Sequence, residues 1–241
     1  GKAEYYLKTK EILVAEMDRL VWIDRFNAMS ALSTFAIEQY YKGSQEYMKE
    51  RFDLHKIILA NKLYGTSEKG GSFNEQLFIN MVVVGLQLKE IEWSESFIKQ
   101  YEPLLNPDYR TNPGFLSRSR LSLAKGKFEE ALMYLSKITS LDKASYKTSV
   151  KNLTLMIYFE MGRSVEALDV ADTYRKFLSR DNILPKAQRD RNANFLKFYN
   201  NLLKYNGNPE MISKVRSEIS TTYNINERQW LLEKTEQLMK N

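Results

Sequence analysis

The feature that most constrains the fold is a seven-residue segment that occurs twice. Residues 126–132 (GKFEEAL) and residues 162–168 (GRSVEAL) share the pattern Gly-basic-x-x-Glu-Ala-Leu, and their first glycines are 36 positions apart. Glycine adopts the left-handed backbone conformation that commonly closes a helix, and a helix-forming sequence follows it in both copies. A turn that repeats at this interval predicts a chain of helical hairpins.

The rest of the chain also favours helices over strands. Its 241 residues include ten glycines and five prolines, too few for the many turns of a β-sandwich or barrel, and 43% of them are hydrophobic. Because the apolar residues follow helical spacing, we expect twelve helices and no strand. A single array over residues 1–241 is expected. The glycine-rich stretch 65–72 offers the alternative of a division into residues 1–64 and 73–241.

A third, degraded copy of the pattern is predicted ahead of the two clear ones. Residues 91–97 (IEWSESF) align with it when Ser96 takes the place of Ala131, which leaves Ile91 near the position of the turn glycine. A small residue at this place lets the two helices of a hairpin approach closely, and a larger side chain would separate them. Near the end of the chain, Asn226 is expected to cap the terminal helix.

A turn glycine, an aromatic residue just after it and a small residue on the second helix together resemble the tetratricopeptide repeat. The matching residues are Gly126, Phe128, Ala131, Gly162 and Ala167, and the similarity covers roughly residues 73–222. The resemblance implies an all-α fold, a right-handed α-α superhelix of about five to six helical hairpins with a C-terminal capping helix. It also implies a non-enzymatic scaffold that binds a peptide or protein partner in a concave groove.

By the same resemblance, the groove is lined by the first helix of each hairpin, and seven residues there are candidates for binding the partner. They are Arg120, Asn152, Met156, Phe159, Asn194, Lys197 and Asn201. Because Lys197 and Asn201 are one helical turn apart, they can hold the carboxylate of a peptide through charge-assisted hydrogen bonds. An ordinary polar helix face is the alternative interpretation of the same residues.

Positive charge supports a second class of partner. The chain carries 36 Lys and Arg against 30 Asp and Glu, and the excess is concentrated in residues 117–151 and 171–204. A nucleic-acid-binding helical repeat would bring the basic side chains of these stretches to one surface. Those side chains are Arg118, Arg120, Lys125, Lys147, Lys151, Arg189, Arg191 and Lys197. A solvated basic face is the structural alternative, and a regulatory solenoid that senses a peptide or small ligand is a third functional one.

The inventory of reactive residues argues against an enzyme. The chain has no cysteine, and His55 is its only histidine, so a Cys- or Ser-based triad and a His- or Cys-rich metal site are not expected. We therefore predict no catalytic residue, cofactor or metal. The apolar run at residues 81–86 is far shorter than the roughly 18 residues of a membrane-spanning helix, and a cytoplasmic location is expected. Because the chain begins with Gly1 rather than Met, we expect that upstream residues were removed.

Overall fold

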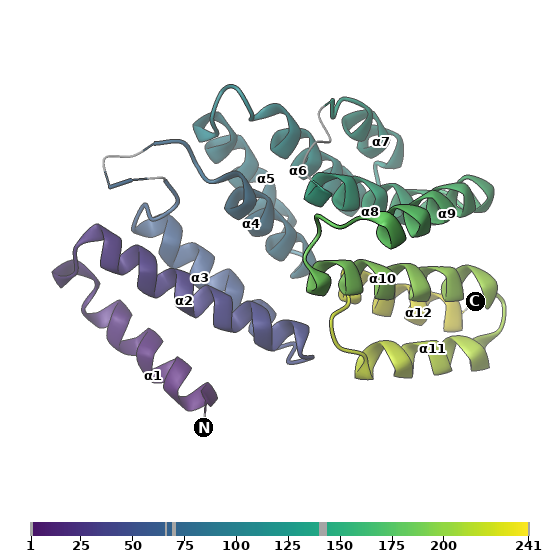
Figure 1. The fold of residues 1–241 in the computed structure, drawn as a ribbon, viewed down its shortest axis with the longest axis horizontal. Helices are drawn as coiled ribbons and strands as arrows, with labels where there is room; N and C mark the ends of the chain where they lie inside the picture. The colour runs from purple at the N-terminus through teal and green to yellow at the C-terminus, as the bar shows by residue number, and fades with distance from the viewer. Residues whose placement is uncertain (1, 66, 69–70, 140–143, 241) are drawn as a thin grey trace. The chain divides into compact units, whose positions relative to one another are not determined.

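The fold is described by a computed structural model that places residues 2–65, 67–68, 71–139 and 144–240 (Figure 1). Within these ranges the protein is all-α: it has twelve α-helices and no strand, and an isolated β-bridge joins Phe73 and Leu105. The helices are α1 (Lys2–Ala15), α2 (Trp22–Tyr41), α3 (Tyr47–Ala60), α4 (Glu75–Gln87), α5 (Ile91–Tyr101), α6 (Thr111–Ala124), α7 (Phe128–Ser136), α8 (Ala144–Glu160), α9 (Ser164–Arg180), α10 (Lys186–Lys204), α11 (Pro209–Thr221) and α12 (Arg228–Lys240). The prediction of an all-helical fold is confirmed for these residues.

Some helices begin where the sequence carries a capping residue. The side-chain oxygen of Asn74 accepts the backbone N–H of Leu77 at 2.9 Å at the start of α4, and Asn208 accepts that of Met211 at 3.1 Å at the start of α11. Such bonds satisfy backbone donors that have no partner inside the helix. Pro209 occupies the first position of α11, where its missing N–H removes no helical bond. Local sequence signals therefore fix these helix starts.

The chain divides into two compact units, residues 1–113 and residues 114–241. The boundary follows Pro113, in the first turn of α6. The glycine-rich stretch 65–72, where the sequence offered an alternative division, lies inside the first unit. Each unit is described separately.

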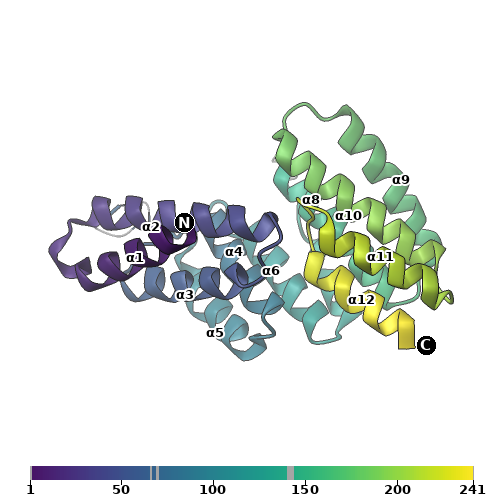
Figure 2. The same ribbon diagram turned by 90° about the horizontal axis from the view of Figure 1, so that it is seen from below.

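In the first unit, each helix from α1 to α4 packs against the next one along the chain (Figure 1, Figure 2). Aromatic rings fill much of the space between α3, α4 and α5. The ring of Phe73 contacts those of Tyr64, Phe78, Phe97 and Tyr101, with centroid separations from 4.6 to 5.9 Å. Each such pair stabilises by about 0.5–1.5 kcal/mol beyond the burial of its surface. These rings hold the connection between α3 and α4 against both following helices.

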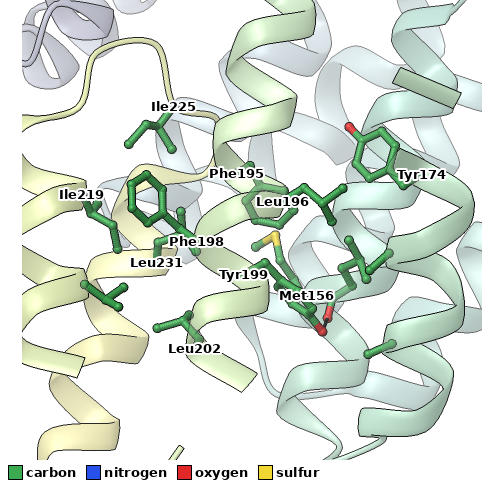
Figure 3. Close-up of a cluster of buried hydrophobic side chains, with 14 of the residues drawn as sticks. Met156, Tyr174, Phe195, Leu196, Phe198, Tyr199, Leu202, Ile219, Ile225 and Leu231 are labelled. Atoms are coloured by element: carbon green, nitrogen blue, oxygen red, sulfur yellow. Dashed lines mark hydrogen bonds between the residues drawn. The ribbon is translucent and has the colours of Figure 1, made fainter. Parts of the chain in front are cut away.

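In the second unit, α7 contacts α8, α8 contacts α9, α9 contacts α10, and α10 contacts both α11 and α12. Figure 3 shows the core that α8 to α12 share, in which Met156, Phe195, Tyr199 and Leu231 are buried. The hydroxyl of Tyr199 donates to the carbonyl of Leu155 at 2.8 Å, so this buried polar group is satisfied. Because Leu231 belongs to α12, the terminal helix contributes to the interior of the unit.

Candidate functional site

The same turn closes three hairpins, α4–α5, α6–α7 and α8–α9. Its left-handed residue is Lys89, Gly126 or Gly162, with φ angles of 63°, 72° and 68°. In each hairpin the N–H of the following residue donates to the carbonyl five residues earlier, at 2.9, 2.8 and 2.9 Å. This bond and the left-handed residue together form the Schellman motif, which ends the first helix. The predicted turn glycines Gly126 and Gly162 therefore lie at equivalent places.

A small buried residue follows each turn at the same distance. Ser94, Ala131 and Ala167 are each the fourth residue of the second helix, and all three are completely buried. The two helices of the α4–α5 hairpin approach closely, because a β-carbon on Gly85 would lie 2.5 Å from the hydroxyl oxygen of Ser94. Only small side chains fit between helices that are this close. Phe128, predicted as the aromatic position of the repeat, is the first residue of α7 and is partly buried.

This register corrects the predicted alignment of the α4–α5 hairpin. Lys89, rather than Ile91, occupies the position of the turn glycine, and Ser94, rather than Ser96, is the small buried residue; Ser96 is exposed. The predicted alignment chose the wrong one of two serines, Ser94 and Ser96, because no glycine marks the left-handed position in this hairpin. A lysine there costs roughly 1–2 kcal/mol in steric strain, which the surrounding hairpin offsets.

All seven predicted partner-binding residues lie in the second unit, on α6, α8 and α10. Arg120 is on α6, Asn152, Met156 and Phe159 are on α8, and Asn194, Lys197 and Asn201 are on α10. Residues 222–240, which we call the C-terminal segment, contact several of them. We define the α6–α8–α10 face as the side chains of these helices that contact the C-terminal segment: Arg120, Phe159, Glu160, Asn192, Asn194, Phe195 and Tyr199.

A buried ion pair joins this face to the C-terminal segment. Nη2 of Arg120 lies 2.8 Å from Oε1 of Glu227, and the two side chains are only 11% and 9% exposed. Charged groups that are removed from water in this way are tolerated only when they are paired, because the loss of hydration is large. The pair therefore fixes the start of the C-terminal segment on α6.

Asparagine side chains of α8 and α10 continue the polar contact. Oδ1 of Asn192 accepts hydrogen bonds from the side-chain amides of Asn152, at 3.0 Å, and Asn226, at 2.7 Å. The amide of Asn194 donates to the backbone carbonyls of residues 223–224, at 3.2 and 3.0 Å. Asn226, which was predicted to cap the terminal helix, thus bonds to α10 through its side-chain amide.

An aromatic contact follows one turn further along. The indole ring of Trp230 meets the ring of Phe159 edge-on at a centroid separation of 5.3 Å and stacks on that of Tyr199 at 6.2 Å. The indole N–H donates to Oε1 of Glu160 at 3.0 Å, and the ammonium group of Lys234 pairs with the same oxygen. The half-buried indole thus combines a ring contact with a satisfied donor, as interface tryptophans commonly do.

The same part of the unit contains unsatisfied polar atoms and strained backbone. Nε of Arg120, Oδ1 of Asn152 and the hydroxyl of Tyr174 are buried and have no hydrogen-bond partner among the described residues. Each costs roughly 1–3 kcal/mol. Burial, and to a smaller extent the carboxylate of Glu227, raises the pKa of Tyr174, so its hydroxyl stays protonated. Asn224 and Glu227 have left-handed φ angles of 53° and 51°, each costing on the order of 1 kcal/mol.

The other predicted groove residues have different environments. Met156 belongs to the buried core. Lys197 pairs at 3.1 Å with Glu218 of α11, and both side chains are more than half exposed. Asn201 is partly buried. From the sequence we expected Lys197 and Asn201 to bind the carboxylate of a partner peptide. In the structure Glu218 of the same chain supplies a carboxylate to Lys197.

Several residues of the contact were not predicted as binding residues from the sequence: Glu160, Asn192, Phe195, Tyr199, Asn226, Glu227 and Trp230. Glu227 lies just before α12 and has a left-handed backbone, so helical spacing does not relate it to Trp230. No local pattern in the sequence therefore indicated that these residues meet.

Many basic residues of the nucleic-acid hypothesis are bonded within the chain. Besides Arg120 and Lys197, Arg189 donates to the carbonyl of Asp181 at 2.7 Å, and Lys151 donates to the hydroxyl of Thr173 at 3.1 Å. Burial lowers the pKa of Lys151. These bonds reduce the number of cations that are available for phosphate groups.

A surface pocket of about 410 Å³ lies on α9, lined by Thr173, Lys176, Phe177, Arg180 and Asp181. The ammonium group of Lys147, on the adjacent helix α8, lies 6.0 Å from the centroid of the Phe177 ring. The pocket thus has cations and an aromatic face, which suit an anionic ligand, but also a carboxylate, which does not. Its lining therefore favours no single class of ligand.

His55, the one histidine, lies on α3 in the first unit and is buried. Burial, and to a smaller extent the nearby guanidinium of Arg51, lowers the pKa of His55 to about 3. A base with such a pKa is poorly matched to proton transfer near neutral pH. Its Nδ1 atom has no hydrogen-bond partner in the described part of the chain, so the residue sits in the core as a neutral ring.

The part of the chain that the structure describes contains no cluster of three or more His, Cys, Asp or Glu side chains placed to hold a metal ion. Nor does any helix within the described ranges have the length and apolar character needed to cross a membrane. Comparison with known proteins identified no relative: no family model, no curated protein and no solved structure matches the chain.

Proposed function

We propose that the protein is a non-enzymatic interaction scaffold, built from helical hairpins of the tetratricopeptide type, that binds a peptide or protein partner. The observation that carries this proposal is the repeated turn. Lys89, Gly126 and Gly162 share one backbone conformation, and a completely buried small residue follows each at the same distance. Hairpins that repeat in this way stack through their neighbours and offer an extended binding surface.

The contacts within each unit support the same proposal. In the first unit every helix from α1 to α5 packs on its neighbour in sequence, and in the second unit α7 to α11 do so as well. Sequential packing of this kind is the arrangement of a solenoid. A right-handed superhelix of about five to six hairpins, with α12 as its terminal helix, is the architecture that we propose.

Affinity capture followed by direct binding tests this function. The immobilised chain is used to capture proteins from a lysate of its source cell, and each captured protein is purified and titrated against the free chain. The double variant Lys197→Ala/Asn201→Ala changes two residues of α10 that the resemblance places on the binding surface. We expect it to weaken binding of the partner about tenfold, equivalent to about 1.4 kcal/mol.

The matched control is Lys214→Ala, which removes an exposed lysine that pairs with Glu210 on α11. It should leave the affinity unchanged, since exposed pairs contribute little. If no captured protein binds the purified chain directly, the scaffold function is rejected. Equal weakening by both variants would reject the assignment of the binding surface to α10.

Binding of nucleic acid is the second candidate, favoured by a cation beside a partly exposed aromatic ring. The ammonium group of Lys147 on α8 lies 6.0 Å from the centroid of the Phe177 ring on α9. Titration with generic single-stranded RNA and DNA over a range of salt concentrations separates the two functions. A steep loss of affinity with salt would support this candidate. Absence of binding at low salt would exclude it.

A further inference from the structure

We propose that the α6–α8–α10 face is a peptide-binding site that the chain's own C-terminal segment fills, and that a partner peptide of matching chemistry displaces this segment. The matching partner carries a carboxylate and, three residues later, a tryptophan or similarly large aromatic residue. This inference rests on the proposed scaffold function and specifies one of its sites, the chemistry of its partner and the way in which access is controlled.

The carboxylate requirement follows from Arg120. Its guanidinium is largely buried and pairs with Glu227, and its Nε atom has no partner among the described residues. A second carboxylate oxygen placed in line with both nitrogens would satisfy this donor as well, because guanidinium and carboxylate groups match in a bidentate geometry. The chain's own C-terminal segment therefore leaves one donor of Arg120 without a hydrogen bond, and a partner's carboxylate can bond to both nitrogens.

The aromatic requirement follows from the surroundings of Trp230. Phe159 and Tyr199 supply two ring faces, and Glu160 accepts the indole N–H. Tryptophan combines a large apolar surface with one donor, and this site provides a contact for each. A phenylalanine at the same place would leave Glu160 without that donor. Tryptophan and arginine are also the residues that dominate the affinity of protein interfaces.

The backbone at the start of the C-terminal segment supports its displacement by a partner peptide. Asn224 and Glu227 both have left-handed backbone conformations, which non-glycine residues seldom adopt, and they flank the point at which the chain turns onto the face. Beneath the segment, Asn152 has an unsatisfied buried oxygen. Strained backbone and unsatisfied polar atoms gather where a structure changes state, since each lowers the cost of opening.

A fixed structural cap is the competing explanation, and the test is designed to separate the two. The opened variant is the full chain with Glu227→Gln/Trp230→Ala, which removes both anchors. The matched control is the full chain with Glu236→Gln/Tyr223→Ala. It changes the same residue classes on the same segment, but Glu236 pairs with Arg216 of α11, and Tyr223 is 65% exposed.

The probe is a fluorescein-labelled synthetic peptide of residues 222–240, titrated against each full chain and followed by fluorescence anisotropy. We expect the opened variant to bind it at least tenfold more tightly than the wild-type chain or the control variant does. The same peptide carrying Glu227→Gln and Trp230→Ala should not bind. If the opened variant keeps the wild-type circular dichroism spectrum and binds the peptide no more tightly than the wild-type chain, the proposal is overturned.

Hydrogen exchange on the unmodified chain provides a measurement that does not depend on the variants. We expect the amides of α12 to exchange at least tenfold faster than those of α8 and α10, through an opening that leaves the other helices folded. If the amides of α12 exchange at the same rate as those of α8 and α10, the segment is a fixed cap and the proposal is refuted.

The two proposals fail in different ways. If a captured partner binds but α12 does not open, the scaffold function stands and this site is rejected. If the opened variant binds the peptide while no cellular protein binds the chain directly, the face binds only the chain's own C-terminal segment. The scaffold function is then rejected.

Discussion

His55 should make the stability of the first unit depend on pH in a range where few other side chains titrate. In the folded protein, burial and then Arg51 lower its pKa from 6.5 to about 3. An unfolded chain has no such environment, so its histidine titrates near 6.5. Above pH 6.5 both states carry a neutral ring. Between pH 6.5 and about 3 only the unfolded state binds the proton, and stability therefore falls as the pH falls.

The magnitude follows from linkage. One proton bound only by the unfolded state changes the free energy of unfolding by about 1.4 kcal/mol per pH unit. Lowering the pH from 7 to 5 should therefore cost about 2 kcal/mol, a large fraction of the stability of an ordinary domain. The carboxylates titrate mostly below this range, and His55 is the only histidine, so the attribution is direct.

Two measurements check this prediction. Chemical denaturation at several pH values between 5 and 7 gives the slope, and the variant His55→Leu, which cannot bind the proton, should lose it. The proton NMR signal of the single imidazole ring should show no titration in the folded protein down to about pH 4. A histidine signal that titrates near pH 6.5 in the folded state, or an unchanged slope in the variant, would refute the reasoning. If the leucine variant does not fold, His55→Gln serves the same purpose.

Three further substitutions test the turns, the hairpin contacts and the buried ion pair, each by chemical denaturation. Lys89→Gly should stabilise by about 0.5–1 kcal/mol, because glycine relieves the left-handed strain but gains entropy in the unfolded chain; a loss of stability would contradict this account. Ala167→Leu should destabilise by about 1–3 kcal/mol through overpacking, whereas Val165→Leu, at a site that is 74% exposed, should change stability by less than about 0.5 kcal/mol. Glu227→Gln should cost about 3 kcal/mol because it leaves a buried guanidinium unpaired. Glu218→Gln breaks an exposed pair and should cost less than about 1 kcal/mol, so similar losses in the two variants would show that burial does not set the difference.

The helical class and most turns could be predicted from the sequence because they depend on local signals. Gly126 and Gly162 mark left-handed positions, and Ala131 and Ala167 mark the close approach of two helices. These residues act on their immediate neighbours, so their meaning does not depend on the rest of the fold. Lys89 was missed because it reaches the same conformation without the residue that usually signals it.

The candidate site could be predicted only in part, because its contacts join distant parts of the chain. The resemblance placed Arg120 and Phe159 on an inner surface, and in the structure each of them contacts the C-terminal segment. It could not show that Glu227 and Trp230 cover them, since no local pattern ties α12 to α6 or α8. Long-range pairing of this kind depends on how the hairpins stack, which the spacing of turns alone does not determine.

The separation of Arg120 and Glu227 along the chain has a consequence for the order in which the protein folds. Most helix contacts join neighbours in sequence, and chains dominated by such contacts fold in microseconds to milliseconds. The pair of Arg120 and Glu227 spans 107 positions, so forming it closes a long loop at a high cost in chain entropy. We therefore expect this contact to form after the folding transition state. Removal of the Glu227 carboxylate should then accelerate unfolding while the rate of folding stays the same.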